Sequence, residues 1–228
     1  FYVNASEWTP VADARFAAQD YGGISIEGRQ VHVLITSGAV DSVAVSLDAG
    51  PGRGALDREK DCTLPPGWTP TVRGRRSEGR LELRADPSPD DACVLQWRVV
   101  VPEPYGVRVD LAAGVIEIED SAGPLDLHLD VGDIRATTSR APVRASVGTG
   151  SIDVDFVGRH DGPLDLRTSV GDVRLFLAGR RLRGDTSAGV GARIRMDGVS
   201  GPGQGRPAID LRANVGDVEL RIEGAGPA

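Results

Sequence analysis

The chain has 228 residues, with 33 acidic and 26 basic side chains and a formal net charge of −7. An excess of acid repels nucleic-acid phosphates, so no nucleic-acid partner is expected. Aromatic residues make up only 4% of the chain, whereas Gly and Pro number 30 and 15. This composition indicates many tight turns and argues against an aromatic-lined ligand pocket.

The first 106 residues show β patterns of uneven spacing. Residues 1–22 are expected to form a capping segment, in which Thr9-Pro10 begins either a helix or an edge strand containing Phe16. Residues 23–106 carry several alternating apolar runs, the longest from Cys93 to Val101, and we expect irregular β rungs there. Residues 48–54 are expected to form a loop between two of these strands.

Two cysteines, Cys62 and Cys93, lie in this part of the chain without any zinc-type spacing. An even number of cysteines favours a disulfide between them, and the alternative is two buried free thiols. A disulfide requires an oxidising compartment, so export is expected, with a signal or anchoring segment removed before Phe1. No run approaches the roughly 18 apolar residues of a membrane span, so if the protein touches a membrane, its anchor lies outside this sequence.

From residue 107 onward the chain repeats itself. The segment 123–134, which contains GPLDL and then GDI, returns 39 positions later in 162–173 and again, 45 positions further on, in 209–218. Period-2 apolar alternation on both sides of a Gly turn, recurring at an interval, predicts stacked β units that cannot bury their faces alone. We therefore predict an all-β fold, a parallel β-solenoid (β-helix-like) with regular repeats over 107–224, continuous with the N-terminal part in a single domain.

Turn residues define the repeats. We expect rungs of about 18–21 residues, each with two short strands about a glycine that adopts positive φ, with aspartates that bond their own neighbouring backbone. Val131, Val170 and Val215 are expected in one interior column, and the segment from Gly198 to Pro207 in a protruding loop. The expected repeat turns are Gly114, Gly132, Asp133, Gly150, Gly171, Asp172, Gly191, Gly216 and Asp217.

Several of these segments resemble a known family. The strand Val99 to Pro102, the following Val107-Arg108-Val109, the segment from Gly114 to Ile118 and the repeated Val-Gly-Asp-Val turns are similar to those of the DUF4097 family, also known as adhesin-like or LiaG-like proteins. The resemblance covers roughly residues 20–224. It implies a right-handed parallel β-solenoid in an exported or envelope protein of bacteria, commonly beside a membrane anchor, and it implies no catalytic residue.

Two groups of acidic residues have patterns typical of metal sites. Asp126, His128 and Asp130 alternate along one strand and project from one face, as ligands of a divalent metal can, but Arg167 and Arg212 replace the histidine in later copies. The turn aspartates lack the Gly-Asp density of a Ca²⁺-binding β-roll. A solvated face and plain turns are therefore expected, with no metal and no cofactor.

Two further groups resemble catalytic sites. Asp153 and Asp155 beside Asp172 and Arg174 imitate the acidic cluster of polysaccharide-cleaving β-helix enzymes, but the chain lacks sugar-stacking aromatics. Ser146 with His160-Asp161 lacks the nucleophile elbow of a hydrolase triad. We therefore expect no catalytic residue and no enzyme.

Together these patterns predict a non-catalytic protein exported to the bacterial envelope, either periplasmic or at the cell surface. We expect an adhesin-like binding or scaffolding module whose partner is an envelope or surface protein or a glycan. One alternative is a filament subunit that self-associates end to end through unpaired strand edges. The other alternative is a polysaccharide-active β-helix enzyme.

Overall fold

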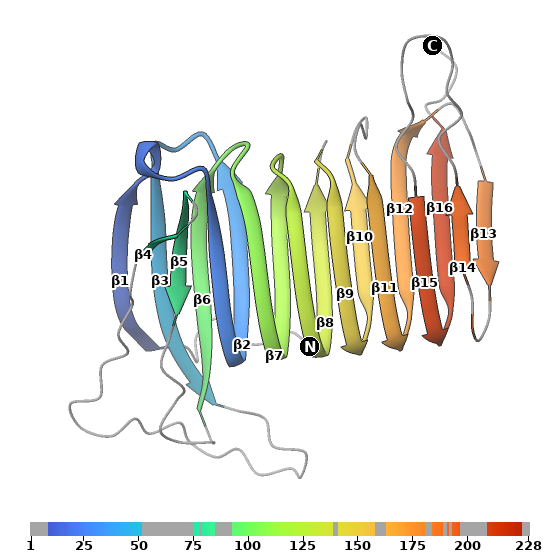
Figure 1. Cartoon of the computed structure of the whole chain (residues 1–228), viewed down its shortest axis with the longest axis horizontal. Helices are drawn as coiled ribbons and strands as arrows, with labels where there is room; N and C mark the ends of the chain where they lie inside the picture. The colour runs from blue at the N-terminus through green and yellow to red at the C-terminus, as the bar shows by residue number, and fades with distance from the viewer. Residues whose placement is uncertain are drawn as a thin grey trace.

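The structure, a computed structural model, describes residues 9–51, 75–77, 79–84, 93–138, 141–157, 163–180, 184–188, 191, 193–196 and 209–224. In these segments the fold is all-β, and the strands form one 16-stranded, mostly parallel sheet (Figure 1). The described helical structure is the short 3-10 turn η2 (Ala18–Asp20). Cys62 and the predicted loop from Gly198 to Pro207 lie outside the described residues.

The strands alternate in burial as the sequence patterns predict. In the N-terminal part they are β1 (Thr9–Ala17), β2 (Gly23–Gly38), β3 (Ser42–Pro51), β4 (Arg75–Ser77), β5 (Arg80–Arg84) and β6 (Cys93–Pro102). In the repeats they are β7 (Gly106–Ser121), β8 (Leu125–Thr138), β9 (Val143–Thr149), β10 (Ile152–Phe156), β11 (Leu164–Val170), β12 (Val173–Arg180), β13 (Gly184–Ala188), β14 (Arg193–Met196), β15 (Ile209–Val215) and β16 (Val218–Gly224).

From β2 onward the chain stacks parallel layers, which we call rungs A to F. Rungs A, B and C are the long strands β2, β7 and β8, and rungs D, E and F each contain two strands, β9 with β10, β11 with β12, and β15 with β16. Leu125 of rung C lies beside Val143 of rung D, and Ile134 lies beside Ile152. One step from C to D therefore advances 18 residues, as predicted.

Each rung bends at a corner, which divides it into two halves. We call the outward surface before the corner the first face and the one after it the second face. Apolar side chains from both halves are buried in one cluster, in which Leu127 comes from the first half of rung C and Ile134 from its second half. Because adjacent side chains of a strand point to opposite sides, the polar residues between them face outward.

The corner also corrects one expectation. Val131, Val170 and Val215 do lie in one column of the stack, but they are 53%, 46% and 51% exposed rather than interior. Leu129 and Ile134 are both buried although they are five positions apart, an odd offset, so the alternation must break between them. The alternation breaks at the bend, and the valines lie on the outer side of this bend, which faces solvent.

Glycine is required at this corner because the rungs approach closely. Gly114, Gly132, Gly150, Gly171 and Gly216 have φ values of 143°, 133°, 137°, 133° and 136°. A Cβ on Gly132 would overlap the carbonyl oxygen of Gly114 in the previous rung, and the same overlap recurs at each later step. Residues with a Cβ rarely adopt this φ, and their Cβ would not fit against the backbone of the previous rung.

Gly191 does not belong to this column. Its φ is 79°, and a Cβ added to it would meet nothing within 4 Å. The rung predicted around it is wrong, because β11 pairs directly with β15 and β12 directly with β16. The chain between them instead returns as β13 and β14, which run antiparallel to β16 and β15. This excursion explains the 45-residue spacing of the third copy.

Antiparallel strands cover both ends of the described stack. At the N-terminal end, β5 and β6 still pair parallel with β2 of rung A. Beyond them, β3 pairs antiparallel with β6, β1 with β3 and β4 with β5, and β1 carries Pro10 beside a register irregularity. In the expected capping segment, residues 9–17 thus form an edge strand rather than a helix, with Phe16 packed partly against the core. The loop predicted at 48–54 is corrected over residues 48–51, which belong to β3 and pair with β6; residues 52–54 lie outside the described residues.

Candidate functional site

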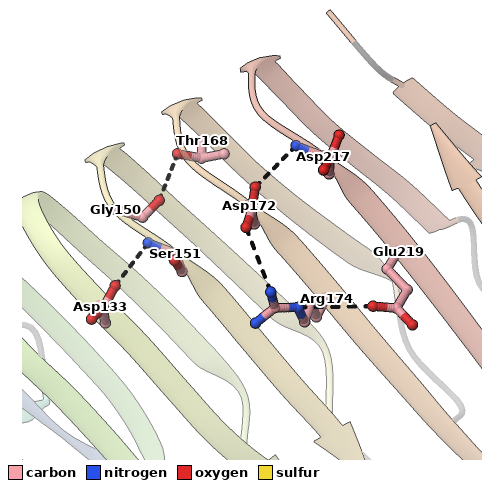
Figure 2. A network of polar contacts seen from close by, with 8 residues as sticks. All are labelled: Asp133, Gly150, Ser151, Thr168, Asp172, Arg174, Asp217 and Glu219. Carbon is pink, nitrogen blue, oxygen red and sulfur yellow. Dashed lines mark hydrogen bonds and ion pairs between the residues drawn. The ribbon is translucent and has the colours of Figure 1, made fainter. Parts of the chain in front are cut away.

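The corner aspartates connect neighbouring rungs. The backbone N–H of Ser151 in rung D donates to Asp133 Oδ1 of rung C at 2.9 Å, and the N–H of Asp217 in rung F donates to Asp172 Oδ1 of rung E at 3.0 Å (Figure 2). From the sequence we expected each aspartate to form hydrogen bonds with its own neighbouring backbone, whereas these hydrogen bonds join each carboxylate to the next rung. Each carboxylate therefore satisfies a backbone donor of the next turn.

A second set of contacts holds the corner from the inside. The buried hydroxyl of Thr168 donates to the carbonyl oxygen of Gly150 at 3.1 Å (Figure 2). The N–H of Gly150 donates in turn to the carbonyl of Val170 at 2.8 Å. Rungs D and E are thus joined on both sides of the glycine column.

Beyond the corner, charges of alternating sign follow the second face. We call this set the acid–base column; in rungs B to F it consists of Glu117, Arg135, Asp153, Arg174 and Glu219. Arg135 Nη1 lies 3.2 Å from Glu117 Oε1. Arg174 contacts both Glu219 Oε2 at 3.8 Å and Asp172 Oδ2 at 3.5 Å (Figure 2). Opposite charges on adjacent rungs attract, so like charges recur on every second rung. This alternation gives a physical reason for the 39-residue repeat of the sequence.

Two columns of polar side chains follow the first face. The lateral column, from rung A to rung F, is Ser25, Arg108, Asp126, Arg144, Asp165 and Asp210. The medial column is Glu27, Asp110, His128, Ser146, Arg167 and Arg212. The lateral column alternates in sign from rung B to rung E, whereas the medial column passes from acid to base.

The candidate metal ligands lie together on this face. His128 shares a 2.8 Å hydrogen bond with Ser146 Oγ through Nδ1, and its Nε2 lies 3.3 Å from Asp130 Oδ1. The later rungs have related contacts between residues two apart, such as Arg167 Nε to Asp165 Oδ1 at 2.6 Å. Among the described residues, no group of three or more His, Cys, Asp or Glu is arranged to hold a metal ion.

The carboxylates of the second face differ in environment. Asp153 lies between Arg135 and Arg174 of the adjacent rungs, whereas Asp155 lies between Thr137 and Phe176. Partial burial, followed by the neighbouring charge of Asp153, raises the pKa of Asp155. The structure therefore brings together Asp153, Arg174 and Asp172, as the sequence suggested, and adds Phe176 beside Asp155.

Other predicted groups are only partly described. His160 and Asp161 lie outside the described residues, and Ser146 contacts His128 instead. Cys93 begins β6, but neither its side chain nor Cys62 is described, so their disulfide stays a prediction.

Sequence reasoning missed three polar groups near the N-terminal end. The hydroxyl of Tyr105 lies 2.7 Å from the carbonyl oxygen of Ala18 and 2.6 Å from that of Tyr21, and burial raises its pKa, with Tyr21 and Asp20 contributing. Asp48 is buried and lies 3.0 Å from Arg98 Nε. Burial lowers the pKa of His32, against the opposing effect of Glu117. No local motif marks these contacts, because they join distant segments.

In the described part of the chain, no helix is long and apolar enough to cross a membrane. No protein-family model matches the sequence, and no curated protein matches it. Among solved structures it is similar to a proposed cell adhesion protein from Clostridium sporogenes, with 13% identity, a TM-score of 0.44 and coverage of 95% of this chain and 100% of that chain. This similarity assigns neither a family nor a function to the chain.

Proposed function

We propose that the chain is a two-faced parallel β-solenoid that acts as a non-catalytic, adhesin-like binding or scaffolding module of the bacterial envelope. Six parallel rungs with one shared apolar core support the solenoid path. The observation that carries the functional proposal is the acid–base column. It holds charged side chains in line, one rung or about 4.8 Å apart, on a surface built from strands rather than loops.

Such a surface suits an extended partner. Arg135 and Arg174 stand two rungs apart, or about 9.6 Å, with Asp153 between them. A glycan or a surface protein with repeated polar groups can meet several of these side chains at once. Because the column is already ordered, binding loses little conformational entropy. Export to the periplasm or the cell surface completes the proposal.

Binding to isolated bacterial envelope fractions tests this function. We expect the purified chain to bind a cell-wall glycan or surface-protein fraction, and the double variant Arg135→Glu/Arg174→Glu to bind at least about tenfold more weakly. The matched control is Arg108→Glu/Arg144→Glu, which makes the same charge change on the first face. Equal loss in both variants, or no binding by the unmodified chain to any fraction, would reject the second face as the binding surface.

One observation favours a second candidate, a polysaccharide-cleaving enzyme. Asp153 and Asp155 project from the same side of β10 with Cα atoms about 6.6 Å apart, and the raised pKa of Asp155 suits a general acid. New reducing ends from an acidic glycan, lost in Asp155→Asn, would favour the enzyme. A broad glycan screen without products would favour binding.

A further inference from the structure

The medial column of the first face has a charge order that the stability of the stack does not explain. Glu27 and Asp110 lie on adjacent rungs A and B, and Arg167 and Arg212 lie on adjacent rungs E and F. Like charges about 4.8 Å apart repel, so this order costs stability in the isolated chain, although Arg84 of β5, which lies beside Glu27 on its other side, offsets part of the cost at the Glu27 end. The acid–base column of the second face avoids such pairs throughout rungs B to F.

The column is, however, complementary to itself when reversed. A twofold axis parallel to the strands, lying in the plane of the face between rungs C and D, exchanges rung A with F, B with E and C with D. In the medial column this operation places Asp110 opposite Arg167 of a second copy and Glu27 opposite Arg212. His128 then meets Ser146 of the second copy, a pairing that these two side chains already make within one chain.

The lateral column obeys the same symmetry. Under the same axis Arg108 lies opposite Asp165 of the second copy, and Asp126 lies opposite Arg144. The graded medial column selects this axis position, and the alternating lateral column is compatible with it. Each charge in rungs B to E of these columns meets an opposite charge.

We propose that the first face is a self-recognition surface, on which a second copy of this chain docks with its rungs in reverse order. Its side chains reach solvent: those of Glu27, His128 and Arg167 are 48%, 50% and 54% exposed. The ion pairs that Glu27 makes with Arg84 at 2.8 Å and Arg167 makes with Asp165 are exposed ones, which exchange partners at little cost. This side-by-side contact differs from end-to-end growth and yields a closed dimer.

Charge balance and size predict how strong the contact is. The two columns carry four arginines against five carboxylates, so docking does not oppose two strongly acidic surfaces. Six rungs of about 4.8 Å and strands about 20 Å long give a face of roughly 600 Å² per copy, below the roughly 800 Å² of a standard interface. The dimer is therefore weak, forms at high micromolar concentration and weakens as salt is added.

Charge reversal with complementation tests the pairing. In Asp110→Arg the new arginine faces Arg167 of the second copy, and in Arg167→Asp the new carboxylate faces Asp110. Sedimentation equilibrium at low salt should show at least about tenfold weaker association for each variant alone. An equal mixture of the two should recover association, because in the mixed dimer both contacts join opposite charges. Far-UV circular dichroism confirms that each variant is folded.

Two further readouts separate docking from general charge effects. Asp110→Arg removes the repulsion with Glu27, so the isolated chain should become more stable to urea while its association weakens. The second-face controls Glu119→Arg and Arg135→Asp make the same charge changes and should leave association unchanged. A chain that stays monomeric at millimolar concentration and low salt would overturn the proposal. So would a mixture that associates no better than its components, or controls that weaken association equally.

Discussion

Replacing Gly171 by alanine tests the corner column most severely. A Cβ at this position would overlap the carbonyl oxygen of Gly150 and lie 2.7 Å from its carbonyl carbon. Both atoms belong to the backbone of the previous rung, so no side chain can move aside to relieve the contact. The φ of Gly171, 133°, is also a conformation that alanine rarely adopts.

The cost has two parts. Forcing alanine into a glycine-only conformation costs about 1–3 kcal/mol. Displacing the Gly150 carbonyl removes the acceptor of the buried Thr168 hydroxyl, which costs about 1–3 kcal/mol more. We therefore expect Gly171→Ala to lower the free energy of unfolding by about 4 kcal/mol, a loss at the upper end for single substitutions.

Urea denaturation followed by circular dichroism measures this loss, and two glycines serve as controls. Gly38→Ala meets nothing within 4 Å and should change stability by less than about 0.5 kcal/mol. Gly191→Ala also meets nothing but has positive φ, so about 1 kcal/mol is expected. In the background of Thr168→Val, Gly171→Ala should cost less, because the hydroxyl is already absent. If Gly171→Ala were as mild as Gly191→Ala, the close approach of the rungs would be refuted.

Three further predictions concern single polar groups. Tyr105→Phe should lower the free energy of unfolding by about 1–2 kcal/mol, because the carbonyls of Ala18 and Tyr21 lose a buried donor; urea denaturation showing no change would contradict this clamp. Folding raises the pKa of Asp155, so this carboxyl lowers the free energy of unfolding as pH rises from its unfolded pKa, near 3.8, through its folded pKa. Asp155→Asn should therefore be more stable than the parent at pH 7, and the difference should shrink toward pH 3. A difference that stays constant with pH would contradict the raised pKa. Folding lowers the pKa of His32, so the stability that its neutral imidazole contributes is complete above pH 6.5 and is lost as pH falls toward the folded pKa. In thermal melts, His32→Gln should lose less stability than the parent as pH falls. The same pH dependence in both proteins would argue against the burial of the imidazole.

Much of the fold was predictable because period-2 alternation reports directly which side chains face the core. The buried positions of β8 and β11 follow it up to Leu129 and Thr168, and the glycine spacing marks the bends. Alternation cannot show where a bend breaks it, so Val131, Val170 and Val215 were wrongly placed inside. The alternation of charge sign from rung to rung could be recognised only once the strand register was known, because the paired side chains lie 18 or more residues apart in the sequence.

Where the prediction failed, a long-range pairing decided the outcome. Gly191 resembles the other turn glycines in its local sequence, but β11 pairs with β15 and leaves no space for a rung between them. Asp48 lies in a segment of turn-forming residues, yet pairing with β6 extends β3 through it. The contacts of Tyr105 and Asp48 join elements that no periodicity relates, so only the folded arrangement could reveal them.

Every proposed surface depends on the register of the rungs, and NMR couplings across backbone hydrogen bonds measure that register directly. In deuterated protein, the amide nitrogen of Ile152 should couple to the carbonyl carbon of Asp172, and that of Val173 to the carbonyl carbon of Asp217, since these bonds are 2.9 Å long. Both couplings, with the amide of Gly171 coupled to Val215, are the result that a stack of parallel rungs predicts. Couplings of these amides to other carbonyls would contradict the stack, and with it both faces.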